Sequence, residues 1–156
     1  MSVTIKHGSF DRLIESVKSV RNLEELGRVA VKEMRLSLER GISPVRGERR
    51  LERYSASYTK AIQKGWLEFQ DKKVRPVNLF LSGKMLRSLE FKATYGSLLV
   101  GIWDSEMVEL ASYHQDGTDK MPARRFVPTT SGEALTVTID RALINKLKDI
   151  ITKAIK

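Results

Sequence analysis

The chain has no cysteine, and that absence excludes several kinds of site together. Without thiols the protein has no disulfide framework, no thiolate zinc site and no cysteine nucleophile. Imidazole is almost as scarce, because His7 and His114 are the only histidines among 156 residues. The composition therefore fits a protein made in a reducing compartment, and we expect no metal site.

Long apolar runs are absent too. Leu98 to Trp103 is the longest uninterrupted apolar stretch, and it is far too short to cross a bilayer. Residues 1–8 lack the basic segment and apolar run of an export signal, so we expect a protein that is cytoplasmic when made, with no membrane partner. The hydrophobic fraction of 41% with 30% charged residues is ordinary for a globular chain, and the length predicts one domain over residues 1–156.

Positive charge is in excess, since 28 lysines and arginines face 19 aspartates and glutamates. Counting from Arg46 to Arg75 gives nine basic and four acidic residues, so the excess is concentrated there. Such a surface favours nucleic acid or an acidic protein as a partner. The candidate contacts are Arg46, Arg49, Arg50, Arg53, Lys60 and Lys64.

Two tyrosines interleave with these basic residues, and two interpretations of them stay open. Tyr54 and Tyr58 could stack on bases while the neighbouring cations bind phosphates. They also share one face of an amphipathic helix with Ala61 and Ile62, which favours a core or subunit contact over a stacking platform.

The first part of the chain is expected to be helical over residues 9–40, after a short strand at 2–6. Apolar spacing predicts a short helix that begins at Ser9 and a long helix capped by Asn22 and ended by Gly41. A flexible basic loop is expected over residues 43–54, because that stretch has little periodicity and no recognisable apolar anchor. A further helix is predicted from residue 55 to 65.

In the middle of the chain the spacing of apolar residues changes from a helical to a strand-like pattern. We predict a core over residues 79–140 that contains a β-hairpin. Ser82 is expected to cap a short helix, and residues 90–95 and 97–103 read as two strands joined at Gly96. The second strand is continuously apolar, which predicts burial on both of its faces. Asp104 or Ser105 is then expected to cap a helix in which Met107, Leu110 and Ala111 face inward and which ends at Gly117.

The end of the chain predicts a strand followed by a helix. Leu135, Val137 and Ile139 alternate with threonines, and Asp140 is placed to cap a final helix over residues 141–156. The whole pattern predicts an α+β fold: a long N-terminal helix and shorter helices packed on a small antiparallel sheet, with a C-terminal helix.

No recognisable catalytic centre is present in the sequence. Glycines occur singly, so there is no phosphate-binding loop or dinucleotide motif, and no metal-ligand spacing is found. His114 near Asp116 and Asp119 could in principle be a base with a carboxylate partner, which gives a hydrolase as a remote alternative. Because nothing supplies a nucleophile, we expect a structural histidine, no enzyme activity and no cofactor.

Three motifs occur in a fixed order around the predicted hairpin. Residues 81–89 read Leu-Ser-Gly-Lys-Met-Leu-Arg-Ser-Leu, residues 111–118 read Ala-Ser-Tyr-His-Gln-Asp-Gly-Thr, and residues 121–127 read Met-Pro-Ala-Arg-Arg-Phe-Val. With the Gly-Ile-Ser-Pro stretch at 41–44, this order resembles the tail-completion and virion-morphogenesis proteins of tailed bacteriophages. The resemblance covers residues from about 22 to 150. The extension before Ser9 does not match it.

The resemblance implies a structural virion protein of the neck, head–tail connector or minor tail, made in the host cytoplasm and incorporated into the particle. It implies no enzyme but a cyclic homo-oligomer, a sixfold ring by analogy, that adjoins neck, tail-terminator or tail-tube proteins and surrounds passing DNA. A ring needs a contact between two different patches of each subunit. The interface candidates, expected at a subunit contact rather than in a core, are Arg124, Arg125, Phe126, Tyr113 and His114. The alternative is a basic nucleic-acid-binding protein that uses residues 46–64.

Overall fold

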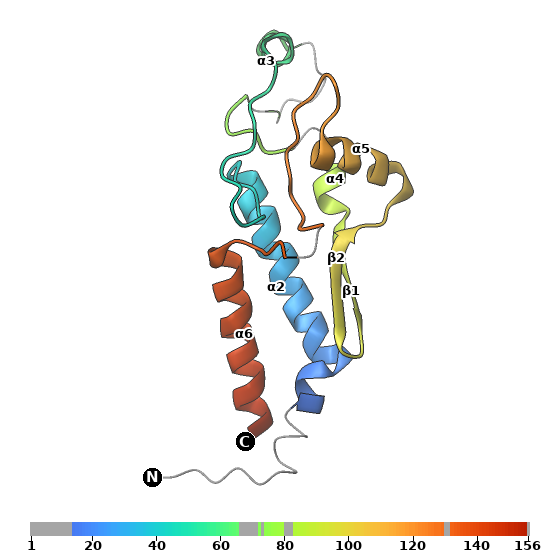
Figure 1. The fold of residues 1–156 in the computed structure, drawn as a ribbon, viewed down its shortest axis with the longest axis vertical. Helices are drawn as coiled ribbons and strands as arrows, with labels where there is room; N and C mark the ends of the chain where they lie inside the picture. Colours follow the sequence, from blue (N-terminus) through green and yellow to red (C-terminus); the bar gives the residue numbers. More distant parts are fainter. Residues whose placement is uncertain (1–13, 66–71, 73, 80–82, 130–131, 156) are drawn as a thin grey trace.

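The computed structural model describes residues 14–65, 72, 74–79, 83–129 and 132–155. Its elements are α2 (Val20–Glu39), α3 (Ala56–Gln63), α4 (Lys84–Arg87), β1 (Leu89–Thr94), β2 (Ser97–Ile102), α5 (Ser105–Asp116) and α6 (Val137–Ile155) (Figure 1). This is the α+β fold predicted from the sequence. The expected strand at 2–6 and the expected caps at Ser9 and Ser82 lie outside the described residues. No described helix is both long enough and apolar enough to cross a membrane.

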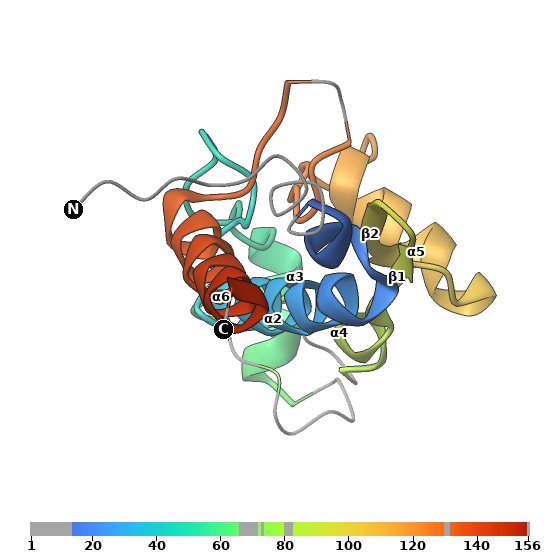
Figure 2. The same cartoon turned by 90° about the horizontal axis from the view of Figure 1, so that it is seen from below.

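Helix α2 is the element on which the others pack. Its buried residues recur three or four positions apart, so they form one stripe along the helix. The hairpin of β1 and β2 contacts α2, and α6 runs beside α2 on its other side (Figures 1 and 2). The buried stripe consists of Gly27, Ala30, Val31, Met34 and Leu38.

The predicted break between two N-terminal helices is confirmed, but the residue that caps α2 is different. Residues 14–18 are helical and the chain bends at Ser19, whose hydroxyl accepts the N–H of Asn22 at 3.4 Å. Asn22 is therefore inside the helix, where its side-chain amide donates to the carbonyl of Ser16 at 2.7 Å. The C-terminal end is as predicted, because Gly41 follows the helix with a φ of +71° that favours glycine.

The predicted hairpin is confirmed, with Leu89 opposite Ile102 and Thr94 opposite Ser97 around a two-residue turn. The expectation that its second strand is buried on both faces is wrong, because the sheet has only two strands. One face of the sheet lies on α2, whereas the other is open, and Leu99 is 59% exposed there. Alternate residues of the continuous apolar run in β2 therefore face α2, and the residues between them lie on the open face of the sheet.

The last helix begins four residues earlier than the sequence pattern indicated. Residues 137–140 continue helically into the rest of α6, so Asp140 lies in the first turn and is not the cap. The alternation of Leu135, Val137 and Ile139 misled the prediction, because Ile139 is 2% exposed as part of a helical face against α2. Leu135 alone pairs in an extended manner, in an isolated bridge with Val45.

The basic segment at 43–54 is anchored, contrary to the premise on which its flexibility was predicted. Val45 is 1% exposed and Leu51 is 7% exposed, so both contribute to the core. The carbonyl of Pro44 accepts the N–H of Thr136 at 2.8 Å, and Ser43 donates its hydroxyl to the carbonyl of Arg125. Apolar side chains separated by arginines were too sparse to produce a recognisable period.

Helix α5 follows the prediction at both ends. The carboxylate of Asp104 accepts the N–H groups of Glu106 and Met107, and Gly117 ends the helix with a φ of +78°. Ala111 is buried as expected, but Leu110 is 39% exposed.

Gly27 allows α2 to approach the hairpin closely. A Cβ atom at this position would lie 2.5 Å from Cγ and Cδ2 of Phe91 and 3.0 Å from Leu98. Both neighbours come from the sheet face that covers α2, so the helix and sheet would have to move apart.

We predict that Gly27→Ala lowers stability, although helix propensity alone would favour alanine by about 1 kcal/mol. Overpacking at such a contact typically costs ~1–3 kcal/mol, which outweighs that gain. Chemical denaturation of the variant measures the net effect. In a Phe91→Leu background the cost should shrink, whereas a stabilising Gly27→Ala in the wild-type background would contradict the close contact.

Candidate functional site

Arg124 and Phe126 are core residues of the subunit, and the expectation that they lie at a contact rather than in the core is wrong. Each is 3% exposed. The guanidinium of Arg124 donates from Nε to the carbonyl of Glu52 at 2.7 Å and from Nη2 to the carbonyl of Arg53 at 2.8 Å. Backbone carbonyls thus take the place of the carboxylate that a buried arginine was assumed to need.

Phe126 joins the core cluster that includes Leu38 and Leu51. A buried glutamine that the sequence analysis missed supports it. The side-chain oxygen of Gln115 accepts the N–H of Phe126 at 3.0 Å, and its amide donates to the carbonyl of Val127 at 2.8 Å. The spacing could have indicated that Gln115 is buried, since it lies four residues after Ala111 on the buried face of α5.

The remaining interface candidates differ in exposure. Arg125 is partly buried, pairs with a carboxylate oxygen of Glu133 at 2.5 Å and donates to Thr129. Tyr113 is 43% exposed, and its hydroxyl donates to Glu109. Of the predicted contact residues, Tyr113 is the one that reaches the surface without a partner from another element.

His114 lies at the end of α5 beside a cavity of about 380 Å³. Its Nδ1 atom is buried and has no hydrogen-bond partner among the described residues. Neither Asp116 nor Asp119 hydrogen bonds to its ring, so the described structure does not assemble the acid–base pair of the hydrolase alternative. No group of three or more potential metal ligands occurs within the described part of the chain.

Two cations and two tyrosines face the same cavity. The Nζ of Lys72 donates to the hydroxyl of Tyr54 at 2.5 Å and lies 4.5 Å from the centre of that ring. The guanidinium of Arg124 lies 5.2 Å from the same ring centre, on which Tyr58 packs edge to face at 5.1 Å. Tyr54 therefore packs against the core and against Tyr58. Because Tyr54 precedes α3, the expectation that the two tyrosines share one helical face is wrong.

Burial shapes the protonation of these groups. Burial lowers the pKa of Lys72 to about 8, and the nearby Arg124 adds to this effect. Burial also lowers the pKa of His114 to about 4, with further contributions from Arg124 and Lys72. Burial raises the pKa of Tyr54 to about 12. At neutral pH the cavity therefore contains charged Arg124, mostly charged Lys72 and a neutral imidazole.

The depressed pKa of His114 predicts that the protein loses stability in mild acid. The unfolded chain takes up a proton at a pKa of about 6.5, whereas the folded ring resists protonation until about 4, so stability falls as pH drops between these values. The loss from this one residue is at most ~3 kcal/mol. Denaturation of wild type and His114→Gln from pH 7 to pH 4.5 measures it, and equal slopes for the two proteins would exclude His114 as the cause.

The basic residues singled out from the sequence have two different roles. Arg46 holds the start of α6, because it donates to the carbonyl of Leu135 at 3.1 Å and pairs with Asp140. The others are exposed on the segment before α3 or on α3 itself. Within the described residues, no ion pair involves Arg49, Arg50, Arg53 or Lys60. Lys64, at the end of α3, is exposed as well.

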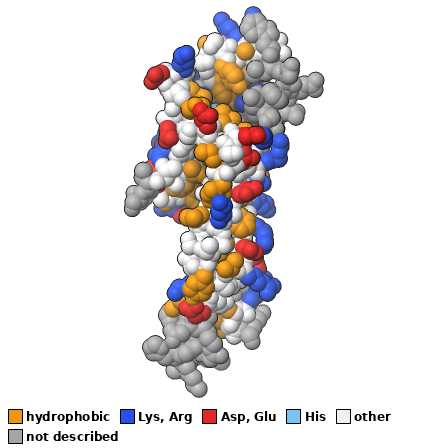
Figure 3. All heavy atoms as spheres, turned by 90° about the vertical axis from the view of Figure 1, so that its right-hand side faces the viewer, with side chains coloured by type: hydrophobic (Ala, Val, Ile, Leu, Met, Phe, Trp, Pro, Cys, Tyr) orange, Lys and Arg blue, Asp and Glu red, His pale blue; other side chains and the backbone are white. Residues whose placement is uncertain are grey.

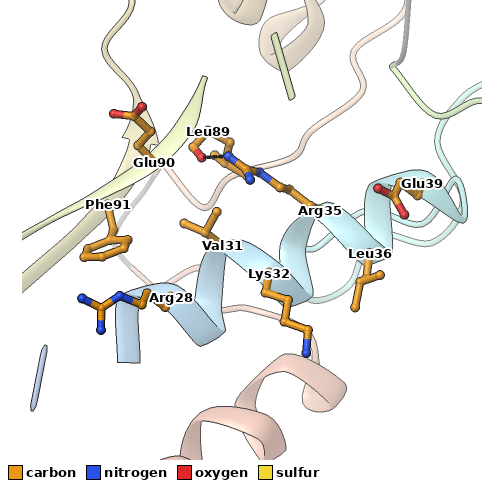
Figure 4. Close-up of a pocket in the computed structure, with 9 residues that line it drawn as sticks. All are labelled: Arg28, Val31, Lys32, Arg35, Leu36, Glu39, Leu89, Glu90 and Phe91. Atoms are coloured by element: carbon orange, nitrogen blue, oxygen red, sulfur yellow. Dashed lines mark hydrogen bonds between the residues drawn. The ribbon is translucent and has the colours of Figure 1, made fainter. Parts of the chain in front are cut away.

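A groove of about 530 Å³ separates α2 from β1 (Figure 4). Arg35 crosses it from α2, and Figure 4 shows its guanidinium directed at Leu89. Phe91 and Val31 supply apolar lining, while Arg28 and Glu90 carry charges of opposite sign. The groove therefore follows the edge of β1 that pairs with no strand among the described residues.

The backbone of that edge is available for hydrogen bonding. Thr94 and Ser97 flank a two-residue turn and form a hydrogen-bonded pair, so alternate residues of β1 direct their N–H and C=O groups away from β2. Phe91 and Ala93 are such residues, and Leu89 is another, because its carbonyl accepts from Arg35 at 2.7 Å. Open edges of this kind pair readily with another chain.

Large apolar side chains are exposed on the open face of the hairpin and on α5. Figure 3 shows hydrophobic side chains along one side of the molecule, with charges of both signs between them. Trp103 lies over Gly101, and Lys92 lies 4.5 Å from the centre of its ring. We use the name outer side for the exposed surface of the hairpin and α5; its exposed large apolar residues are Leu99, Trp103, Val108, Leu110 and Tyr113.

Comparison with known proteins identifies no match: no family model, no curated protein and no solved structure is significantly similar to this chain.

Proposed function

We propose that the chain is a structural protein of a tailed-phage particle, a part of the ring at the head–tail junction or tail end through which DNA passes. It assembles with copies of itself and with neighbouring neck or tail proteins in the host cytoplasm, and it turns over no substrate. The ordered motifs at 81–89, 111–118 and 121–127 support membership in this class.

The observation that carries the proposal is the incomplete hairpin. A two-stranded sheet is marginally stable alone, and this one gains support from α2 on one face only. The edge of β1 and the outer side remain open, and both present groups that a neighbouring subunit can bind: unpaired backbone at Phe91 and Ala93, and apolar side chains such as Leu99. Two such different patches on one subunit suit the head-to-tail contact of a ring.

The exposed fraction of each side chain decides which of the interface candidates can contact a neighbouring subunit. Tyr113 stays an interface candidate because it is exposed on the outer side, whereas Phe126 and Arg124 act inside the subunit. Arg125 is tied to Glu133 on its own chain and is a weaker candidate.

We predict that Leu99→Glu reduces self-association at least tenfold while the thermal melt of the subunit is unchanged, because Leu99 is 59% exposed and contributes little to the core. Ile144→Glu is the matched control, since Ile144 is 50% exposed on α6. Sedimentation velocity over a concentration series gives the association constant. Equal association of wild type and Leu99→Glu would contradict the assignment of the outer side.

A second function, nucleic-acid binding, is favoured by one observation: Arg49, Arg50, Arg53 and Lys60 are exposed and form no ion pair with a described residue. Such cations would gain from releasing phosphate counterions. They could equally bind an acidic neighbour in the particle.

We predict that the isolated chain binds naked duplex only weakly, with a Kd above about 1 μM at 150 mM salt, which is the non-specific range. Fluorescence anisotropy from 50 to 300 mM salt measures this. Tight binding that is lost in Arg49→Glu/Arg50→Glu, but kept in Lys148→Glu/Lys153→Glu on α6, would favour the nucleic-acid function over the structural one.

A further inference from the structure

The cavity beside His114 has the composition of a binding site for an organic anion. It has a volume of about 380 Å³, and residues of α3 and α5 line it together with Lys72 and Arg124. Its wall is mostly apolar, with Met85, Met107 and Leu110 among the lining residues. Pockets for small ligands have this size range and this mixture of apolar wall and a few polar groups.

The described polar side chains that line the cavity are either cationic or neutral, and none carries a negative charge. Arg124, Lys72 and His114 line it together with Tyr54 and Tyr58, and Lys120 lies among the lining residues as well. None of the described residues that line it is an aspartate or a glutamate. A buried guanidinium and a buried ammonium thus share one space without a carboxylate from the described residues.

The hydrogen bonds leave donors free to bind a ligand. Arg124 uses Nε and Nη2 on backbone carbonyls, so Nη1 has no partner among the described residues. Lys72 donates one of its three N–H groups to the hydroxyl of Tyr54. The Nδ1 of His114 is buried without a partner among the described residues.

We propose that this cavity binds a carboxylate attached to an apolar or aromatic body. The carboxylate would accept from Arg124 Nη1 and Lys72 Nζ, and the body would lie against the methionines and the tyrosine rings. A charged hydrogen bond in such a dry environment is worth more than a neutral one, which explains selection for the anion over a neutral analogue. The carboxylate could belong to a free small acid or to the C-terminus of a peptide.

The protonation of the apo cavity supports this inference. The lowered pKa values of Lys72 and His114 both reflect burial beside other cations, and a bound anion would raise both. Binding should therefore weaken as pH rises above about 8, where Lys72 loses its proton while Arg124 stays charged.

The test uses phenylacetate and its neutral analogue phenylacetamide on the full chain. We expect phenylacetate to raise the melting temperature, to shift the His114 ring signals in NMR and to bind at least tenfold more tightly than the amide. A peptide ending in phenylalanine, with either a free or an amidated C-terminus, forms the second arm. The tighter of the two acids identifies the source of the carboxylate.

Lys72→Met removes the charge and keeps much of the side chain, and it should weaken acid binding at least tenfold without affecting the amides. Lys60→Met on α3 is the control and should bind like wild type. Arg124 is unsuited to this test because it holds the carbonyls of Glu52 and Arg53. If neither acid binds better than its amide, or if Lys72→Met binds the acids as wild type does, the proposal is overturned.

Discussion

Two arginines that bind backbone carbonyls hold the described structure together. Arg35 on α2 donates to the carbonyls of Leu86, Arg87 and Leu89 at 3.0, 2.8 and 2.7 Å, so it joins the end of α4 and the start of β1 to the central helix. Arg124 ties the loop after α5 to the segment before α3 in the same manner. Each guanidinium joins segments that are distant in sequence, and a hydrogen bond from a charged donor contributes about 1.5–3 kcal/mol.

This use of arginine explains which parts of the structure the sequence could predict. Local signals were sufficient for the hairpin turn at Gly96, the end of α2 at Gly41 and the cap of α5 at Asp104, because a few neighbouring residues determine each of them. Partners distant in sequence were beyond prediction. Arg124 looked like a surface cation because nothing near it in the chain reveals a carbonyl 72 residues away. The start of α6 was misjudged for a related reason, since its burial against α2 outweighs the strand preference of its β-branched residues.

The same arrangement separates the interior of the subunit from the surface it offers to others. Because Arg124 and Phe126 are inside, the motif at 121–127 stabilises the subunit instead of forming its contact. The open edge of β1 and the outer side are the surfaces that we propose for contacts, while the positive charge of Lys72 and Arg124 lies at a cavity. Part of the positive charge behind the net charge of +9 is therefore buried, and only the exposed cations are available to DNA or to an acidic neighbour.

The account as a whole claims that this chain is a built-in part of a phage particle and that the hairpin side of the subunit makes its contacts. A cryo-EM reconstruction of particles that contain the chain tests this claim most directly. The account predicts a ring at the head–tail junction or tail end, with Leu99 and Tyr113 buried against a neighbouring subunit. Particles that lack the chain, or a ring in which the hairpin and α5 face solvent while α6 makes the contacts, would contradict it.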